Sequence, residues 1–285
     1  MHPRPARSGS VLVSALPVVP PRQGAVAAPA LPPAGLPRFS VSKLEVIRDG
    51  RCVMQAPSLD IPRGEITALV GPTGSGSSTF LRALNRLNEM HARTRTTGHV
   101  LLDGRDIYDR AFPLLELRRR VGMLFPEPNP FARTIYENVA CAPLLAGVRE
   151  RAELDARVES CLRAVGLWGE LAPRLRQGAL DLSDAQQQRL CLARVLASDP
   201  EVVLLDEPCA VLDPVAARQL EDLLLGLSEQ YTLVLATHDR YQAARLSERA
   251  AFFLHGELVE SARTEDLFQC PRDSRTEAFL SGRYG

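Results

Sequence analysis

The sequence predicts an α/β fold with a mainly parallel sheet, and two observations indicate this class. Short apolar runs alternate with helical patterns through the second half of the chain, as in Val202–Leu205 followed by Val215–Leu227. This order builds parallel sheets with helices around them. A further apolar run, Glu65–Val70, leads into a glycine-rich turn, which is typical of a buried strand that is followed by a turn and a helix.

The composition limits the classes of partner. The 285 residues include 34 basic and 34 acidic side chains, so there is no basic surplus of the kind that indicates a nucleic-acid partner. The six cysteines are scattered without metal-ligand spacing, which favours free thiols over a disulfide framework. No apolar stretch approaches the roughly 18 residues of a membrane span, so any membrane role is expected to be peripheral.

The first 38 residues differ from the rest of the chain. They hold nine of the 22 prolines and show neither helical nor strand periodicity, so we predict a disordered tail over 1–38 and a folded domain over 39–285. Alternating apolar and polar residues begin at Phe39, and turn residues separate the runs. The first three predicted strands are Phe39–Ile47, Ser58–Ile61 and Glu65–Val70.

The remaining elements follow from periodicity. Before residue 170 the pattern predicts a strand and turn, a second strand and a helical region: His99–Gly104, Val121–Phe125, Thr134–Ala142, Arg149–Val165 and the neighbourhood of Trp168. After residue 200 it predicts alternating strands and helices that end in a hairpin: Val202–Leu205, Val215–Leu227, Thr232–Ala236, Tyr241–Ser247 and Ala250–Val259.

The turn after Val70 has the spacing of a phosphate-binding P-loop. Glycines in such a loop let backbone N–H groups face an anion, and the following helix adds the positive end of its dipole. Ser77 stands where lysine is expected, and the missing cation is worth roughly 1.5–3 kcal/mol. A glycine-serine turn without a ligand remains the alternative here. The candidate nucleotide-binding residues are Gly71, Pro72, Thr73, Gly74, Ser75, Gly76, Ser77, Ser78 and Thr79.

Polar residues end two of the predicted buried strands. Asp206 and Glu207 close one strand, and His238 follows the next. The C-terminal ends of parallel strands meet at one edge of a sheet, so these residues are expected beside the P-loop. Ser78 and Asp206 suit Mg²⁺ coordination, and Glu207 suits polarising an attacking water. Each of these residues alone is more often structural, but together with the P-loop they favour a catalytic site.

Five stretches occur in the order found in one family: Gly71–Thr79, Leu182–Arg189, Val202–Pro208, Leu212–Pro214 and Thr237–His238. With them the chain resembles the ATP-binding subunits of ABC transporters. Further stretches narrow the resemblance to the bacterial phosphate importers, and it covers residues 39–285. These stretches are Val121–Phe125, Pro128–Phe131, Ile135–Val139, Asp206–Cys209, Gln242–Arg245 and Gly282–Gly285.

The resemblance implies a P-loop NTPase fold: a RecA-like core, an antiparallel β subdomain and an inserted helical subdomain at about 126–187. It implies ATP and Mg²⁺ as ligands, and Glu207 and His238 as catalytic residues. It also implies a homo- or heterodimer of ATP-binding subunits, transmembrane permease subunits, an indirect link to a phosphate-binding protein, and a place on the cytoplasmic face of the plasma membrane. The subunit contact would use Ser183, Asp184, Gln186 and Asp213.

Three departures from the family pattern bear on catalysis. The P-loop lacks its lysine, and Pro126 stands where the family has a glutamine after Phe125. In the signature stretch, Asp184 and Ala185 replace two glycines, so a carboxylate is expected to fill the anion site at that helix start. Ser183 and Gln186 nevertheless keep the pattern of a helix capping box.

These departures leave two hypotheses. In the first, the chain is an importer subunit that hydrolyses ATP slowly, because loss of the P-loop cation weakens stabilisation of the transition-state charge. In the second, it is a pseudo-ATPase that docks on membrane subunits or on an intact paralogue and binds ATP weakly. The resemblance implies ATP hydrolysis, and the residues of the site leave both hypotheses open.

Overall fold

The computed structural model describes residues 36–283, so nearly all of the predicted tail lies outside the described residues. Within these residues, ten strands form one sheet in the order β5-β4-β1-β2-β10-β9-β3-β8-β7-β6. Their bounds are β1 Phe39–Arg48, β2 Arg51–Ile61, β3 Ile66–Val70, β4 Thr94–Leu102, β5 Arg105–Asp106, β6 Val121–Leu124, β7 Val202–Asp206, β8 Thr232–Thr237, β9 Arg249–Leu254 and β10 Glu257–Arg263.

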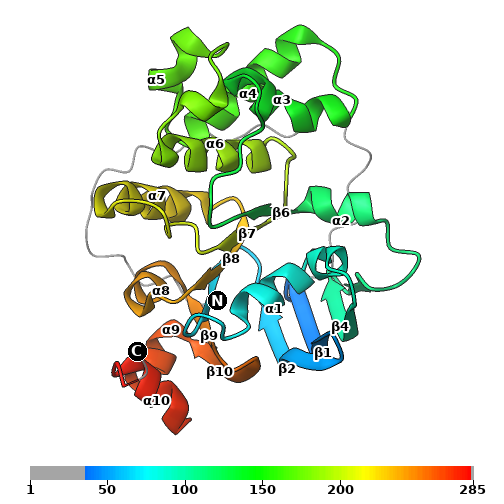
Figure 1. The fold of residues 1–285 in the computed structure, drawn as a ribbon, viewed down its shortest axis with the longest axis vertical. Coiled ribbons are helices and arrows are strands. Elements are labelled where there is room, and N and C mark those ends of the chain that lie inside the picture. The colour runs from blue at the N-terminus through cyan, green and yellow to red at the C-terminus, as the bar shows by residue number, and fades with distance from the viewer. Residues whose placement is uncertain (1–35, 284–285) are drawn as a thin grey trace.

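The sheet has a parallel part and an antiparallel part. Strands β6, β7, β8, β3 and β9 run parallel to one another, whereas β1, β2, β4 and β5 pair antiparallel among themselves. β10 joins the two parts, because it pairs antiparallel with β9 and touches β2 through Glu257 and Gln55. The mainly parallel sheet expected from the alternating pattern is therefore a mixed one, with the antiparallel strands at the opposite edge from β6 (Figure 1).

The helices lie on both sides of this sheet. α3, α4 and α5 gather at one end of the molecule, and α6 lies between them and the strands (Figure 1). Three 3₁₀ turns occupy Leu87–Met90, Ala172–Arg174 and Ala179–Asp181. The α-helices are α1 Ser77–Ala83, α2 Leu114–Arg120, α3 Ile135–Leu145, α4 Arg151–Ala164, α5 Trp168–Leu171, α6 Asp184–Leu196, α7 Pro214–Leu227, α8 Arg240–Leu246, α9 Thr264–Gln269 and α10 Ser274–Leu280.

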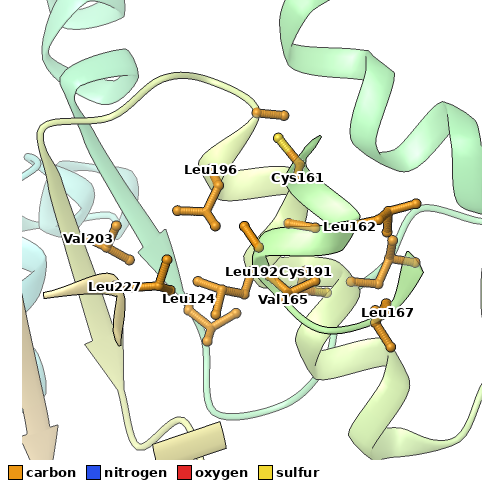
Figure 2. Close-up of a cluster of buried hydrophobic side chains, with 14 of the residues drawn as sticks. Leu124, Cys161, Leu162, Val165, Leu167, Cys191, Leu192, Leu196, Val203 and Leu227 are labelled. Carbon is orange, nitrogen blue, oxygen red and sulfur yellow. The ribbon is translucent and has the colours of Figure 1, made fainter. Parts of the chain in front are cut away.

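An apolar layer fixes the helical end on the sheet. Figure 2 shows Leu124 of β6 and Val203 of β7 facing Leu192 and Leu196 of α6, with Val165 beyond them at the end of α4. All five side chains are almost completely buried. Full burial of one such side chain contributes about 1.5–3 kcal/mol, so the position of α6 relative to the strand ends is strongly determined.

A partly buried ion cluster joins the antiparallel part of the sheet to the parallel part. The Arg120 side chain, only 3% exposed, donates to Glu201 at 2.6 Å and also pairs with Asp103. Arg38 donates to the same two carboxylates. Burial by itself would raise the pKa of Glu201, but the two guanidinium groups outweigh it and lower that pKa. The cluster thus holds its charges only because every member is paired.

We predict that Arg120→Ala lowers the free energy of unfolding by about 3 kcal/mol, because it removes the most deeply buried guanidinium of the cluster and leaves Asp103 and Glu201 with one cation fewer each. Urea unfolding measures the change. The control is Arg133→Ala, which breaks an exposed pair with Glu137 and should cost at most about 1 kcal/mol. Equal losses in the two variants would show that the cluster adds nothing beyond a surface pair.

Candidate active site

The P-loop starts at the end of β3 and has a backbone that only glycine allows. A Cβ on Gly71 would lie 2.2 Å from the backbone oxygen of Phe253, so no side chain fits there. Gly76, with φ of 100°, precedes α1 in a left-handed conformation that favours glycine. Gly74 also has a positive φ, of 81°. The loop is therefore shaped as expected for a backbone that faces an anion.

The Ser77 side chain is turned into the loop. Its hydroxyl accepts a hydrogen bond from Ser75 Oγ at 3.2 Å, and only 9% of the residue is exposed. A hydroxyl so placed adds no positive charge to the site, so Ser77 does not replace the expected lysine.

Asp206 is the polar centre of the site. It ends β7, next to β8 in the parallel part of the sheet, and its side chain is 1% exposed. Oδ1 accepts a hydrogen bond from Ser78 Oγ at 2.7 Å, and Oδ2 accepts one from Arg82 Nη2 at 2.8 Å. The P-loop and the end of β7 are therefore in contact, as expected from the sequence. The contact with Arg82 had not been predicted.

Glu207 and His238 form a pair at the same sheet edge. Glu207 has φ of 45°, a conformation that non-glycine residues seldom adopt. Its Oε1 accepts a hydrogen bond from the backbone N–H of His238 at 2.9 Å and lies 2.9 Å from His238 Nδ1. Both side chains keep solvent access, with 25% and 58% exposed. The strained backbone thus turns the Glu207 carboxylate toward the strand that precedes His238.

The predicted signature residues lie at the start of α6 and do not join this cluster. Ser183 Oγ accepts from Gln186 N and Gln186 Oε1 accepts from Ser183 N, so the expected capping box is present. Gln186 also donates to Glu170 on α5 at 2.7 Å. Asp213 caps α7 in the same way, accepting hydrogen bonds from the amides of residues 215 and 216.

One expectation at this helix start is wrong. Asp184 was expected to fill the anion site with its own carboxylate, but among the described residues it makes no hydrogen bond to the helix amides and its side chain is exposed. The Ser183 hydroxyl takes the amide of Gln186 instead. The reason is geometric: a residue in the first helical turn projects outward, whereas the capping residue before it can fold back onto the amides.

Gln188 connects the site to α6, a role that no sequence pattern predicts. The side chain is fully buried, and its Nε2 donates to the backbone oxygens of Phe125 at 2.9 Å and Pro208 at 3.0 Å. The first oxygen follows β6, where Pro126 replaces the expected glutamine, and the second directly follows Glu207. One amide thus holds two strand ends at a fixed distance from α6.

Cys209, two residues after Glu207, is not a nucleophile here. Burial, together with the nearby Glu221 carboxylate, raises the pKa of its thiol to about 11. The thiol is therefore protonated at physiological pH, and the thiolate is the reactive form.

The residues present fit ATP and Mg²⁺. Gly71 and Gly76 give the loop a backbone that leaves no room for larger side chains, and a hydroxyl with one buried carboxylate is a set of hard oxygen donors. Mg²⁺ is usually held by one or two carboxylates together with substrate phosphates and water. Within residues 36–283, no cluster of three or more His, Cys, Asp or Glu side chains forms an all-protein metal site, so the phosphates would have to complete the coordination.

A family model described as "ABC transporter" matches residues 54–210, which is more than half of the chain and includes every residue of the P-loop and Asp206. The chain belongs to the ABC transporter family. Two curated relatives from Streptococcus pneumoniae, strains TIGR4 and R6, are each 46% identical over 247 residues, covering 87% of this chain and 99% of the relative. Each bears the name "Phosphate import ATP-binding protein PstB 3".

Solved ABC structures have the same fold. CbiO1 from Clostridium perfringens, described as part of the ABC transporter complex cbiONQ, superposes with a TM-score of 0.71 at 25% identity and covers 86% of this chain and 96% of its own. A bacterial Atm1-family ABC exporter with ATP bound gives the same TM-score at 22% identity, over 88% of this chain and 43% of its own.

None of the helices between residues 36 and 283 is long and apolar enough to cross a bilayer.

We predict that Gln188→Leu lowers the free energy of unfolding by about 2 kcal/mol, because one buried and one partly buried carbonyl oxygen lose their donor. Chemical denaturation measures the loss. Gln219→Leu on α7 is the matched control: its side chain is exposed and its effect should stay within about 0.5 kcal/mol. A Gln188→Leu protein as stable as the control would rule out the proposed link between α6 and the strand ends.

Proposed function

We propose that this chain is the ATP-binding subunit of an ABC importer for inorganic phosphate, coupling the binding and hydrolysis of ATP to transport. The observation that carries the proposal is the convergence of three strand ends. The P-loop after β3, Asp206 and Glu207 at the end of β7, and His238 after β8 meet at one edge of the parallel sheet.

Each group of residues in the site would have a separate role in the reaction. The amides of the 71–79 loop would hold the β- and γ-phosphates, and Ser78 with Asp206 would hold Mg²⁺. When bound, Mg²⁺ supplies positive charge to the oxygens on which negative charge develops. Glu207 would orient the attacking water and accept its proton as the bond between the γ-phosphorus and the bridging oxygen breaks. His238, through its contact with Glu207, would fix the position of that carboxylate.

The transported solute is inferred from the relatives. Two proteins that share 46% of their residues with nearly the whole described chain are named for phosphate import. By the same inference, the partners are transmembrane permease subunits and a second ATP-binding subunit, with Ser183, Asp184, Gln186 and Asp213 near the contact between the two ATP-binding subunits. The chain would then work peripherally, on the cytoplasmic face of the plasma membrane.

The pseudo-ATPase alternative has less support. It rests on Ser77, Asp184 and Pro126, but the loop backbone, the Asp206 contact and the Glu207–His238 pair are all formed. The comparisons add nothing in its favour. Activity measured with the intact partner subunits separates the two hypotheses.

We predict that the purified chain binds MgATP and, assembled with its permease subunits, releases phosphate from it. Glu207→Gln should lower turnover about 100-fold or more, because the carboxylate that accepts the proton is lost, while ATP binding is retained. Equilibrium binding and phosphate release are the two measurements. The control is Glu229→Gln, an exposed residue after α7, which should leave both unchanged.

Two outcomes would contradict the proposal. Failure of the wild-type chain to bind ATP at millimolar concentration would support the pseudo-ATPase. Turnover that is unaffected by Glu207→Gln would mean that the water is activated elsewhere.

A further inference from the structure

Arg82 is a charged residue of the site that the proposed reaction does not use. Its guanidinium donates to Asp206 Oδ2 at 2.8 Å, while Ser78 holds Oδ1 of the same carboxylate. The carboxylate is 1% exposed, and the Arg82 side chain is 31% exposed. The ion pair therefore joins a buried carboxylate to a guanidinium whose side chain is partly exposed.

The helix explains how Arg82 reaches this point. Ser78 and Arg82 are four residues apart on α1, so they lie on one face of the helix. Side chains on a helix lean toward its N-terminus, and α1 begins at the P-loop. The long arginine side chain thus carries its charge back toward the loop, to within the width of one carboxylate group from the Ser78 hydroxyl.

The charge matters because the loop lacks the lysine expected at position 77. A triphosphate carries several negative charges, and an unpaired Asp206 beside it would repel them. Ser77 cannot offset that repulsion. The chain contains a single lysine, Lys43, which is on β1 in the antiparallel part of the sheet.

We infer that Arg82 is the fixed cation of the triphosphate site and that, by neutralising Asp206, it makes ATP binding less dependent on Mg²⁺. The inference rests on the proposed function, since it requires that ATP binds at this loop. With Mg²⁺ present, the metal supplies the charge and Arg82 matters less. Without Mg²⁺, the guanidinium is the positive group that remains beside the buried carboxylate.

The experiment measures the dissociation constant for ATP by isothermal titration calorimetry, once in excess Mg²⁺ and once in EDTA. Arg82→Gln should weaken binding about 10-fold or more in EDTA, as expected for loss of a charged contact, and about 3-fold or less in Mg²⁺. Arg82→Lys keeps the charge and should stay within about 3-fold of the wild type in both conditions.

A second background tests whether Arg82 offsets the missing lysine. In a Ser77→Lys protein the loop has its own cation, so adding Arg82→Gln should weaken ATP binding in EDTA by less than about 3-fold. An undiminished effect in this background would mean that the two positions act independently, and would overturn the inference.

Arg245→Gln is the matched control. Arg245 donates to Glu221 at 2.6 Å, and that carboxylate is 5% exposed, so the variant also unpairs a buried carboxylate but leaves the P-loop intact. For Arg245→Gln, the ratio of the ATP dissociation constants in EDTA and in Mg²⁺ should equal that of the wild type. Urea unfolding would show whether Arg82→Gln and Arg245→Gln remain folded.

The outcomes distinguish the two proposals. If wild-type protein binds no ATP in either condition, the proposed function fails and the inference falls with it. If wild-type protein binds ATP but Arg82→Gln leaves the ratio of the two constants unchanged, as Arg245→Gln does, the inference alone is overturned. A larger ratio in Arg82→Gln, rescued by Arg82→Lys, supports both.

Discussion

The site depends on one buried carboxylate. Asp206 is inaccessible to solvent at the end of β7, and a charge in such a place is tolerated only when it is paired and hydrogen-bonded. Ser78 and Arg82 provide those contacts, and both come from α1, the helix that the P-loop opens. The same interaction therefore fixes the helix against the sheet and defines where a metal and phosphates would bind.

The surrounding fold makes this arrangement rigid. The backbone of residue 253 leaves no room for a side chain at Gly71. Glu207 is held at a positive φ by the hydrogen bond from its amide to Ala236 and by its contacts with His238. Gln188 of α6 donates to backbone oxygens that follow two strand ends. Preorganised groups of this kind suit phosphoryl transfer, in which catalysis is mostly positioning and electrostatics.

Local signals in the sequence located several strand ends and helix starts, but β2 begins at Arg51 and not at Ser58, and β4 begins at Thr94 and not at His99. The meeting of Ser78 with Asp206 followed from parallel-strand geometry, and the Ser183 capping box followed from its own spacing. Long-range side-chain contacts were not predictable. Gln188 is one of three consecutive glutamines with nothing to distinguish it, and α2, α9 and α10 are short helices without a clear apolar period. Arg82 could have been found, because it is four residues after Ser78.

This loop is proposed to bind a triphosphate although Ser77 replaces the lysine. A crystal structure of the chain with a non-hydrolysable ATP analogue and Mg²⁺ decides the question. We expect β- and γ-phosphates on the amides of the 71–79 loop, Mg²⁺ held by Ser78 and Asp206, and the Arg82 guanidinium still beside Asp206. A loop without nucleotide at saturating analogue, or a nucleotide bound elsewhere on the chain, would contradict it.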